Sequence, residues 1–337
     1  MEEKKDARKT KAIKLADPKA ATIDPATREM IQVAQEKGVE TVFDRAVNMK
    51  PCNIGTQGTC CKNCGMGPCR LPLPKGGVEG EDERKGLCGA TPNTIAARNF
   101  IRMIAGGAAA HSDHGRSVAE VFLTAARKET DAYKIKDTRK LVEVAKYLGI
   151  DTVVTVDGKI LDRDLDEIAL EVGEKAMDEW GKSEGELLFA KRAPEERYKI
   201  WKKMGVIPRN IDREIVEIMH RTHIGVDQDY KNLMKQGTRA AIADGWGGSM
   251  LATELQDILF GTPYPVASEA NLGVLKEDMV NIVIHGHEPV LSEMIVAVSQ
   301  MKEMDDYAKS KGAKGIQLSG ICCSANEILQ RHGVPLC

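Results

Sequence analysis

The sequence predicts a helical domain followed by a parallel α/β domain. Up to about residue 240, apolar residues recur at the spacing of amphipathic helices. From about residue 278, a short β-branched run, a helical segment and a second short strand follow one another, which is the order of a βαβ unit. Aromatic residues make up only 4% of the chain, and this favours closely packed helices over an all-β sandwich.

The amino-acid composition and charge indicate a soluble protein of two or three domains. The 337 residues are enough for two or three domains, and 42% apolar with 29% charged residues is typical of a soluble globular protein. A net charge of -2 gives no reason to expect nucleic acid or an anionic membrane as partner. The charged N-terminus has no signal-peptide core, and no apolar run approaches the ~18 residues of a membrane span. We therefore expect a cytoplasmic protein, in which clustered cysteines bind metal rather than form disulfides.

Helix starts are visible in the first domain. Asp24 and Pro25 begin a helix, because Asp is a favoured N-cap and Pro is favoured at the first helical position. Gly38 divides this first helical stretch in two. Thr91 and Pro92 repeat the same signal, and their helix runs into A-G-G-A-A-A-H-S-D-H-G-R. Further helices are predicted at about 117–127, 138–148, 163–181, 193–203 and 211–235.

The α/β segment predicts where a site would form. A first strand is predicted at 279–284 and a second at 314–320, with a helix from Val290 to Lys311 between them and a last helix from Ala325 to Arg331. Such a connection makes the strands parallel, and ligands bind beyond the carboxyl ends of parallel strands. His287 follows the first strand, and Cys322 and Cys323 follow the second. The topology therefore brings an imidazole and a thiol together.

These elements give three expected segments. They are a polar arm at 1–23, a helical domain at 24–240 with cysteine-bearing cluster loops at 52–88, and the start of a Rossmann-like α/β domain at 241–337. Two strands alone do not make a stable α/β sheet. We therefore expect the sequence to be incomplete at its C-terminus.

Six of the nine cysteines lie within one glycine-rich stretch: Cys52, Cys60, Cys61, Cys64, Cys69 and Cys88. The last four form a C-x2-C-x4-C pattern with one further cysteine, and four thiolates hold either structural zinc or an iron–sulfur cluster. A zinc ribbon usually pairs two C-x2-C knuckles, and only one is present. A cubane cluster tolerates uneven spacing, because each thiolate binds a separate iron. The pattern favours iron–sulfur, with zinc and unligated thiols as the alternatives.

Cys52 and Cys60 remain outside that set. Cys60 adjoins Cys61, so the two can hardly point at the same cluster. One solution is a two-fold axis, with two cysteines from each of two chains around one shared cluster, which also fits an isologous dimer. The alternative is a pair of ordinary thiols, and the spacing alone leaves both open.

Two further sets are candidates for chemistry. His111 and His114 are three residues apart on a predicted helix, so they share a face and could relay protons near neutral pH. The alternative is a surface or capping pair. His287 and Cys323 are a candidate metal pair, although a single histidine at a strand end is more often a hydrogen-bonded loop residue. Only one cysteine of an adjacent pair usually faces a given metal, so Cys322 is expected to lie behind Cys323.

Together the motifs resemble the anaerobic nickel-containing carbon monoxide dehydrogenases of the hybrid-cluster (prismane-like) superfamily. The match rests on P-C-x7-C-C-x2-C-x4-C-R, G-L-C-G-A, A-A-A-H-S-D-H-G-R, H-G-H-E-P-V-L-S-E and G-I-C-C-S-A-N-E-I-L-Q-R-H-G, in the family's order. It covers the whole chain but only about the first half of the family's length. The resemblance implies the reversible reaction CO + H2O → CO2 + 2H+ + 2e−, with a ferredoxin-like protein accepting the electrons.

The resemblance also implies roles for the cysteines. Cys52 and Cys60 match the ligands of a [4Fe-4S] cluster shared across a homodimer. The set Cys61, Cys64, Cys69 and Cys88 matches the ligands of a second [4Fe-4S] cluster, which relays electrons.

For the active site, the resemblance implies that His287 and Cys323 bind a nickel–iron–sulfur cluster. His111 matches the histidine that assists protonation there, and His114 matches a nearby relay position. The family's remaining active-site cysteines and an acid/base lysine lie beyond the end of this chain, so we expect the chain alone to be inactive. Ser117 and Glu120 follow His114, which puts a four-histidine proton path in doubt.

Three other readings of the sequence remain open. A hybrid-cluster (hydroxylamine reductase) enzyme should lack the G-I-C-C-S-A-N-E motif and the extra Cys52/Cys60 pair. A non-catalytic electron-transfer module would use the N-terminal clusters alone, and a zinc-stabilised helical domain would contain no iron. Association with an acetyl-CoA synthase subunit is also left open.

Overall fold

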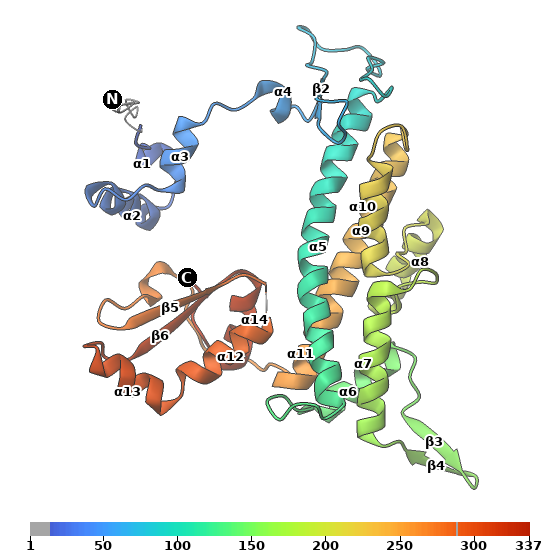
Figure 1. Cartoon of the computed structure of the whole chain (residues 1–337), viewed down its shortest axis with the longest axis vertical. Helices are drawn as coiled ribbons and strands as arrows, with labels where there is room; N and C mark the ends of the chain where they lie inside the picture. Colours follow the sequence, from blue (N-terminus) through green and yellow to red (C-terminus); the bar gives the residue numbers. More distant parts are fainter. Residues whose placement is uncertain (1–13, 288) are drawn as a thin grey trace, which may run out of the picture. The chain divides into compact units, whose positions relative to one another are not determined.

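The computed structural model describes residues 14–287 and 289–337. The chain divides into two compact units, one ending at Gln57 and the other running from Gly58 to Cys337, and Figure 1 labels their elements. Residues 1–13 of the predicted polar arm lie outside the described residues. The expected division into an arm, a helical domain and an α/β domain stays a prediction.

Short helices make up the first unit: α1 (Pro18–Ala21), α2 (Pro25–Glu36), α3 (Val42–Asn48) and α4 (Asn53–Thr56). The predicted start of α2 is confirmed, because the Asp24 carboxylate accepts a hydrogen bond from the Thr27 backbone N–H at 2.7 Å. Gly38 follows α2 with a φ of 68° and separates it from α3, as predicted. The last of these helices, α4, has Cys52 as its N-cap.

A small cysteine-bearing hairpin begins the second unit. Its strand β1 (Cys60–Cys61) pairs antiparallel with β2 (Cys69–Arg70). It is followed by α5 (Pro92–Ala126), a helix of 35 residues with Thr91 as its N-cap, which confirms the predicted start. The separate helix predicted at about 117–127 is instead the last part of α5. The helix continues because no proline lies inside it after Pro92, and its Gly115 packs closely against Gly248.

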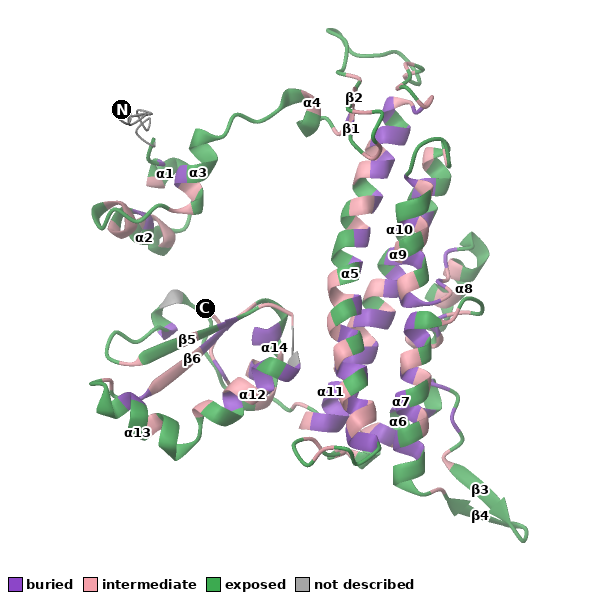
Figure 2. Ribbon diagram, in the orientation of Figure 1, coloured by how far each residue is buried: buried purple, intermediate pink, exposed green. Residues whose placement is uncertain are grey.

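Most of the helices that follow α5 pack with it in a bundle and turn their buried residues inward (Figure 2), whereas the helix at 195–204 has no buried residue. They are α6 (Thr138–Tyr147), α7 (Leu165–Gly181), the 3-10 turn η1 (Leu188–Arg192), α8 (Glu195–Met204), α9 (Ile211–Arg221), α10 (Tyr230–Ala243), the π-helical turn η2 (Asp244–Ser249) and α11 (Met250–Phe260). The single helix predicted at 211–235 is divided, because Asp229 caps a new helix start. An exposed hairpin of β3 (Val153–Val156) and β4 (Lys159–Asp162) was not predicted.

Glycines bring α5 and η2 into close backbone contact. A Cβ at Gly115 would lie 2.5 Å from the Gly248 carbonyl oxygen, and a Cβ at Gly248 would lie 3.2 Å from the His111 backbone. We expect Gly115→Ala to destabilise the fold by about 1–3 kcal/mol, because two backbones must separate. Gly106 lies on the same helix with open space around its Cβ position, so Gly106→Ala should stabilise by about 0.5–1 kcal/mol. Urea unfolding followed by circular dichroism measures both, and equal effects would contradict the close approach.

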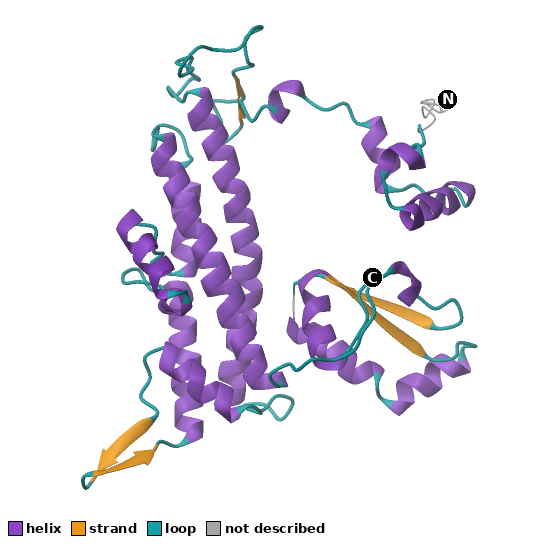
Figure 3. Cartoon of the chain, turned by 180° about the vertical axis from the view of Figure 1, so that it is seen from behind, coloured by secondary structure: helices purple, strands orange, loops and turns teal. Residues whose placement is uncertain are grey.

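The last part of the second unit contains a two-stranded parallel sheet (Figure 3). Its elements are η3 (Leu272–Val274), β5 (Val280–His285), α12 (Pro289–Ser299), α13 (Lys302–Ser310), β6 (Ile316–Ile321) and α14 (Cys322–His332). The parallel pair is confirmed, with His285 opposite Ile321 at the carboxyl ends. The predicted helix from Val290 to Lys311 is two helices.

The last helix starts earlier than predicted. It begins at Cys322 rather than at Ala325, so that both adjacent cysteines lie on its first turn. This start places them directly at the carboxyl end of β6. Among the described residues, even the 35-residue α5 lacks the long apolar stretch that a bilayer crossing requires, and the same holds for the shorter helices.

Candidate metal centres

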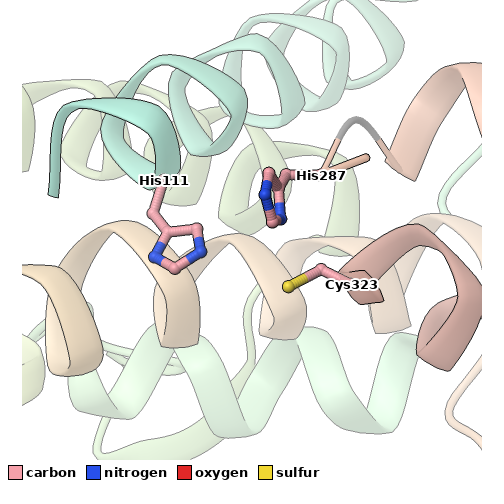
Figure 4. Close-up of side chains that lie close together, drawn as sticks. All are labelled: His111, His287 and Cys323. Carbon is pink, nitrogen blue, oxygen red and sulfur yellow. The ribbon is translucent and has the colours of Figure 1, made fainter. Parts of the chain in front are cut away.

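Three segments far apart in the sequence converge on one group of donor atoms. His111 lies on α5, His287 lies just after β5, and Cys323 lies on the first turn of α14. One donor atom from each of these side chains lies within 4.8 Å of the others. Figure 4 shows the two imidazoles and the sulfur pointing toward one another. The topology thus brings His287 and Cys323 together as expected, while their role as ligands stays a prediction.

The imidazole rings are held in defined orientations. His111 Nδ1 lies 2.7 Å from Asp244 Oδ1, which leaves His111 Nε2 for another partner. The His111 and His287 rings pack edge to face with centroids 5.4 Å apart, and the His114 and His287 centroids are 5.8 Å apart. His114 and His287 each have a buried Nδ1 without a hydrogen-bond partner among the described residues. Asp244 was missed by sequence reasoning, because nothing local connects it with a histidine 133 residues earlier.

A cavity of about 190 Å3 is lined by all three donors and by His114. Gln256, from α11, and Glu327, from α14, form part of its wall. The cavity is lined by residues of α5, η2, α11 and α14. It therefore provides a defined space beside the donor atoms.

The electrostatic surroundings keep both ligand candidates neutral. Burial lowers the pKa of His287, and the neighbouring His111, His114 and His285 lower it further. Burial raises the pKa of the Cys323 thiol, and the neighbouring Cys322, Glu327 and Asp244 raise it further. A bound cation would reverse the second effect, because it stabilises the thiolate. Imidazole and thiolate are donors that nickel, zinc and iron share, so the residues present fit a transition-metal or iron–sulfur centre.

A second site lies at the start of the second unit. The four cysteines of the C-x2-C-x4-C set line one small cavity: Cys61, Cys64, Cys69 and Cys88. The β1–β2 pairing places Cys61 opposite Cys69, and the Leu87 N–H lies 3.5 Å from the Cys69 sulfur. Four thiols around one space fit either a [4Fe-4S] cluster or zinc.

Cys60 and Cys52 are separate from this set. Cys60 faces Arg70 across the hairpin, and successive residues of a strand point to opposite faces, so Cys60 points away from the side of Cys61. Cys52 is exposed, and its sulfur lies 3.5 Å from the Gly55 N–H. Cys52 belongs to the first unit and Cys60 to the second, so their joint role stays a prediction.

Arg98 activates one of the four thiols. Burial raises the pKa of Cys88, but hydrogen bonds outweigh it and lower the pKa to about 7. The largest of these comes from Arg98, whose Nη1 lies 3.5 Å from the Cys88 sulfur. The thiolate is the form that binds metal. A pKa of about 7 favours ionisation of the Cys88 thiol near neutral pH, and this would suit a metal ligand.

We expect Arg98→Met to raise the pKa of Cys88 from about 7 to at least the ~8.5 of an ordinary thiol. The pH dependence of alkylation at Cys88 in the metal-free chain, read by mass spectrometry, measures this pKa. Arg102→Met is the control, because Arg102 bonds the Thr222 hydroxyl instead of a cysteine. An unchanged midpoint in Arg98→Met would contradict the assigned role of Arg98.

Comparison with known proteins gives consistent matches. The model of the Prismane/CO dehydrogenase family matches residues 59–337. Carbon monoxide dehydrogenase 1 of Methanosarcina acetivorans is 49% identical over 317 residues, which are 94% of this chain and 48% of the relative. An as-isolated, nickel-free carbon monoxide dehydrogenase from Thermococcus sp. AM4 has a TM-score of 0.85 at 48% identity, over 96% of this chain and 49% of that chain.

A further solved structure is similar to the chain. It is an acetyl-CoA synthase/carbon monoxide dehydrogenase, described with NiZn[Fe4S4] and NiNi[Fe4S4] clusters in its alpha subunits. Its TM-score is 0.82 at 43% identity, over 97% of this chain and 47% of that chain. The chain thus spans about half the length of the relatives it matches.

Proposed function

The chain belongs to the Prismane/CO dehydrogenase family, and we propose that it serves the oxidation of carbon monoxide with water to CO2, two protons and two electrons. The observation that carries the proposal is the convergence of His111, His287 and Cys323 on one cavity. Two of these, His287 and Cys323, are proposed as ligands of a nickel–iron–sulfur centre. The reaction is supported by the similarity to proteins named carbon monoxide dehydrogenase. We propose that the reaction is reversible.

When bound, such a centre supplies Lewis-acid chemistry and takes up the two electrons. The chain's own residues hold and orient it and move protons. Asp244 fixes His111 at Nδ1, so His111 Nε2 is the atom that would accept a proton. His114 lies beside the His287 ring and is proposed as the next group on the path.

The cysteines near the N-terminal end of α5 are proposed to carry the electrons away. A [4Fe-4S] cluster would bind the set Cys61, Cys64, Cys69 and Cys88, whose side chains share one cavity. A second [4Fe-4S] cluster would be shared in a homodimer by Cys52 and Cys60 of each chain. A ferredoxin-like protein is the proposed acceptor, and an acetyl-CoA synthase subunit is a proposed partner, supported by the similar acetyl-CoA synthase/carbon monoxide dehydrogenase structure.

We also propose that β5, β6 and their helices belong to a Rossmann-like domain, because the pair is parallel with helices between and after its strands. The protein is proposed to work in the cytoplasm.

Metal analysis of the anaerobically purified chain, with CO-dependent viologen reduction on the same sample, tests the function. About six irons per chain are expected from one cubane and half of a shared one, and any iron of the nickel–iron–sulfur centre would come in addition. Because we expect the chain alone to be inactive, nickel together with CO-dependent reduction would mean that the proposed ligand set has to be revised. Iron without nickel or CO response would restrict the chain to electron relay, and zinc in place of iron would contradict both clusters.

A further inference from the structure

The position of Cys323 depends on how α14 is held at both of its ends. At the first turn, the Ser324 N–H donates a hydrogen bond to the Gly286 carbonyl at 2.9 Å. This bond connects the residue after Cys323 with the residue before His287. It fixes one end of α14 next to the histidine, but a single bond does not fix the rotation of the helix about its axis.

Arg331, on the last turn of α14, has a buried guanidinium, and each of its three nitrogens makes a hydrogen bond. Its side chain is only 4% exposed. Nε donates to the Gly261 carbonyl at 3.0 Å, and Nη2 lies 2.6 Å from the Asp257 carboxylate. Nη1 lies 2.6 Å from Glu327 and 3.4 Å from Glu293. One side chain therefore connects α14 with α12, with α11 and with the residue that follows α11.

The spacing along α14 relates this anchor to the candidate centre. Cys323, Glu327 and Arg331 are four residues apart, so they share one face of the helix. Cys323 and Glu327 both line the cavity, and Arg331 binds Glu327 directly. A rotation of α14 that moved Cys323 away from His287 would therefore break the contacts of Arg331.

The charges around Arg331 explain why a guanidinium is needed. Asp257 and Glu293 are almost fully buried. Lys140 also reaches Asp257, at 3.7 Å, and His332 lies 2.7 Å from Glu293. Arg331 contacts carboxylates of three helices at once: Asp257 of α11, Glu293 of α12 and Glu327 of α14. A planar fork with five donors can make these contacts, whereas the compact ammonium of lysine cannot make all of them.

We propose that Arg331 is a positioning residue, which holds α14 so that Cys323 faces His287 and His111. The proposal rests on the proposed function in that Cys323 is taken as a metal ligand. Arg331 itself lies behind the cavity wall and acts through α14.

The test compares Arg331→Lys and Arg331→Met with Arg209→Lys in the full anaerobically purified chain. Arg209 is a suitable control because it also pairs with two glutamates, Glu214 and Glu217, but on α9. Nickel affinity is measured by chelator competition, and nickel K-edge X-ray absorption reports sulfur bound to nickel. We expect both Arg331 variants to weaken nickel binding about 10- to 100-fold and to lose the nickel–sulfur signal. Arg209→Lys should keep both.

Amide hydrogen exchange gives a readout that does not need a metal. We expect faster exchange of the Ser324 amide in both Arg331 variants, more so for methionine, with the α5 segment around His111 unchanged. Unchanged exchange and unchanged nickel–sulfur scattering in the Arg331 variants would overturn the proposal. A wild-type chain whose nickel has no sulfur ligand would contradict the proposed metal site instead, and the exchange measurement would still decide whether Arg331 holds α14.

Discussion

Replacing Cys323 with serine is expected to remove sulfur from the nickel coordination and to weaken nickel binding by more than 100-fold. The loss of a second-shell partner typically costs about 10- to 100-fold in metal affinity, and a direct ligand should cost more. The imidazole of His287 remains, but an imidazole alone holds the metal less firmly than an imidazole and a thiolate together. Iron bound by the cysteine loops should stay unchanged.

Cys322 provides the matched control, since it is the adjacent cysteine on the same turn. Cys322 and Cys323 are both exposed, but Cys322 has a φ of 66° and is not part of the donor group at His111 and His287. We therefore expect Cys322→Ser to bind nickel as the unmodified chain does. Chelator competition and nickel K-edge absorption on both variants measure the difference. An equal loss of nickel affinity in the two variants would mean that both substitutions disturb the first turn of α14, and the Cys323 sulfur would then have no special role in binding nickel.

Local chemistry made several parts of this fold predictable. Asp24 and Thr91 could be recognised as helix starts, because an N-cap followed by proline satisfies the first free N–H groups within a few residues. The parallel β5–β6 pair followed from a β-branched run and a second short strand with a helical segment between them. The meeting of His287 and Cys323 followed from that topology, since both residues come directly after neighbouring strands.

Other features depend on contacts between distant segments. The Asp244–His111 pair joins η2 to α5 and has no local sequence pattern. Asp244 also begins a glycine-containing π-helical turn, whose geometry depends on packing against α5 at Gly115. The β3–β4 hairpin, in contrast, had a usable signal. Asp157 and Gly158 both have positive φ, and Asp-Gly between the β-branched run V-V-T-V and the apolar pair Ile160-Leu161 is a strong hairpin pattern.

Cys60→Ser and Cys61→Ser should separate the two iron–sulfur sites, although the substituted residues are neighbours. The structure gives the two side chains opposite directions, because Cys61 pairs with Cys69 and Cys60 pairs with Arg70. We expect Cys61→Ser to lose about four of about six irons per chain, which is the cubane of the cysteine loop. Cys60→Ser should lose only about two, its half of the shared cluster.

The assembly state makes this comparison sharper. Loss of a shared cluster removes a link between two chains, so Cys60→Ser should also weaken the dimer, and Cys61→Ser should not. On the same samples, iron analysis measures the iron content, electron paramagnetic resonance of the reduced chain detects the clusters, and sedimentation measures the dimer. If both variants lost all iron together, Cys60 and Cys61 would have to serve one site. That result would contradict the β1–β2 register, because neighbouring residues of a strand point to opposite faces and cannot both face Cys69.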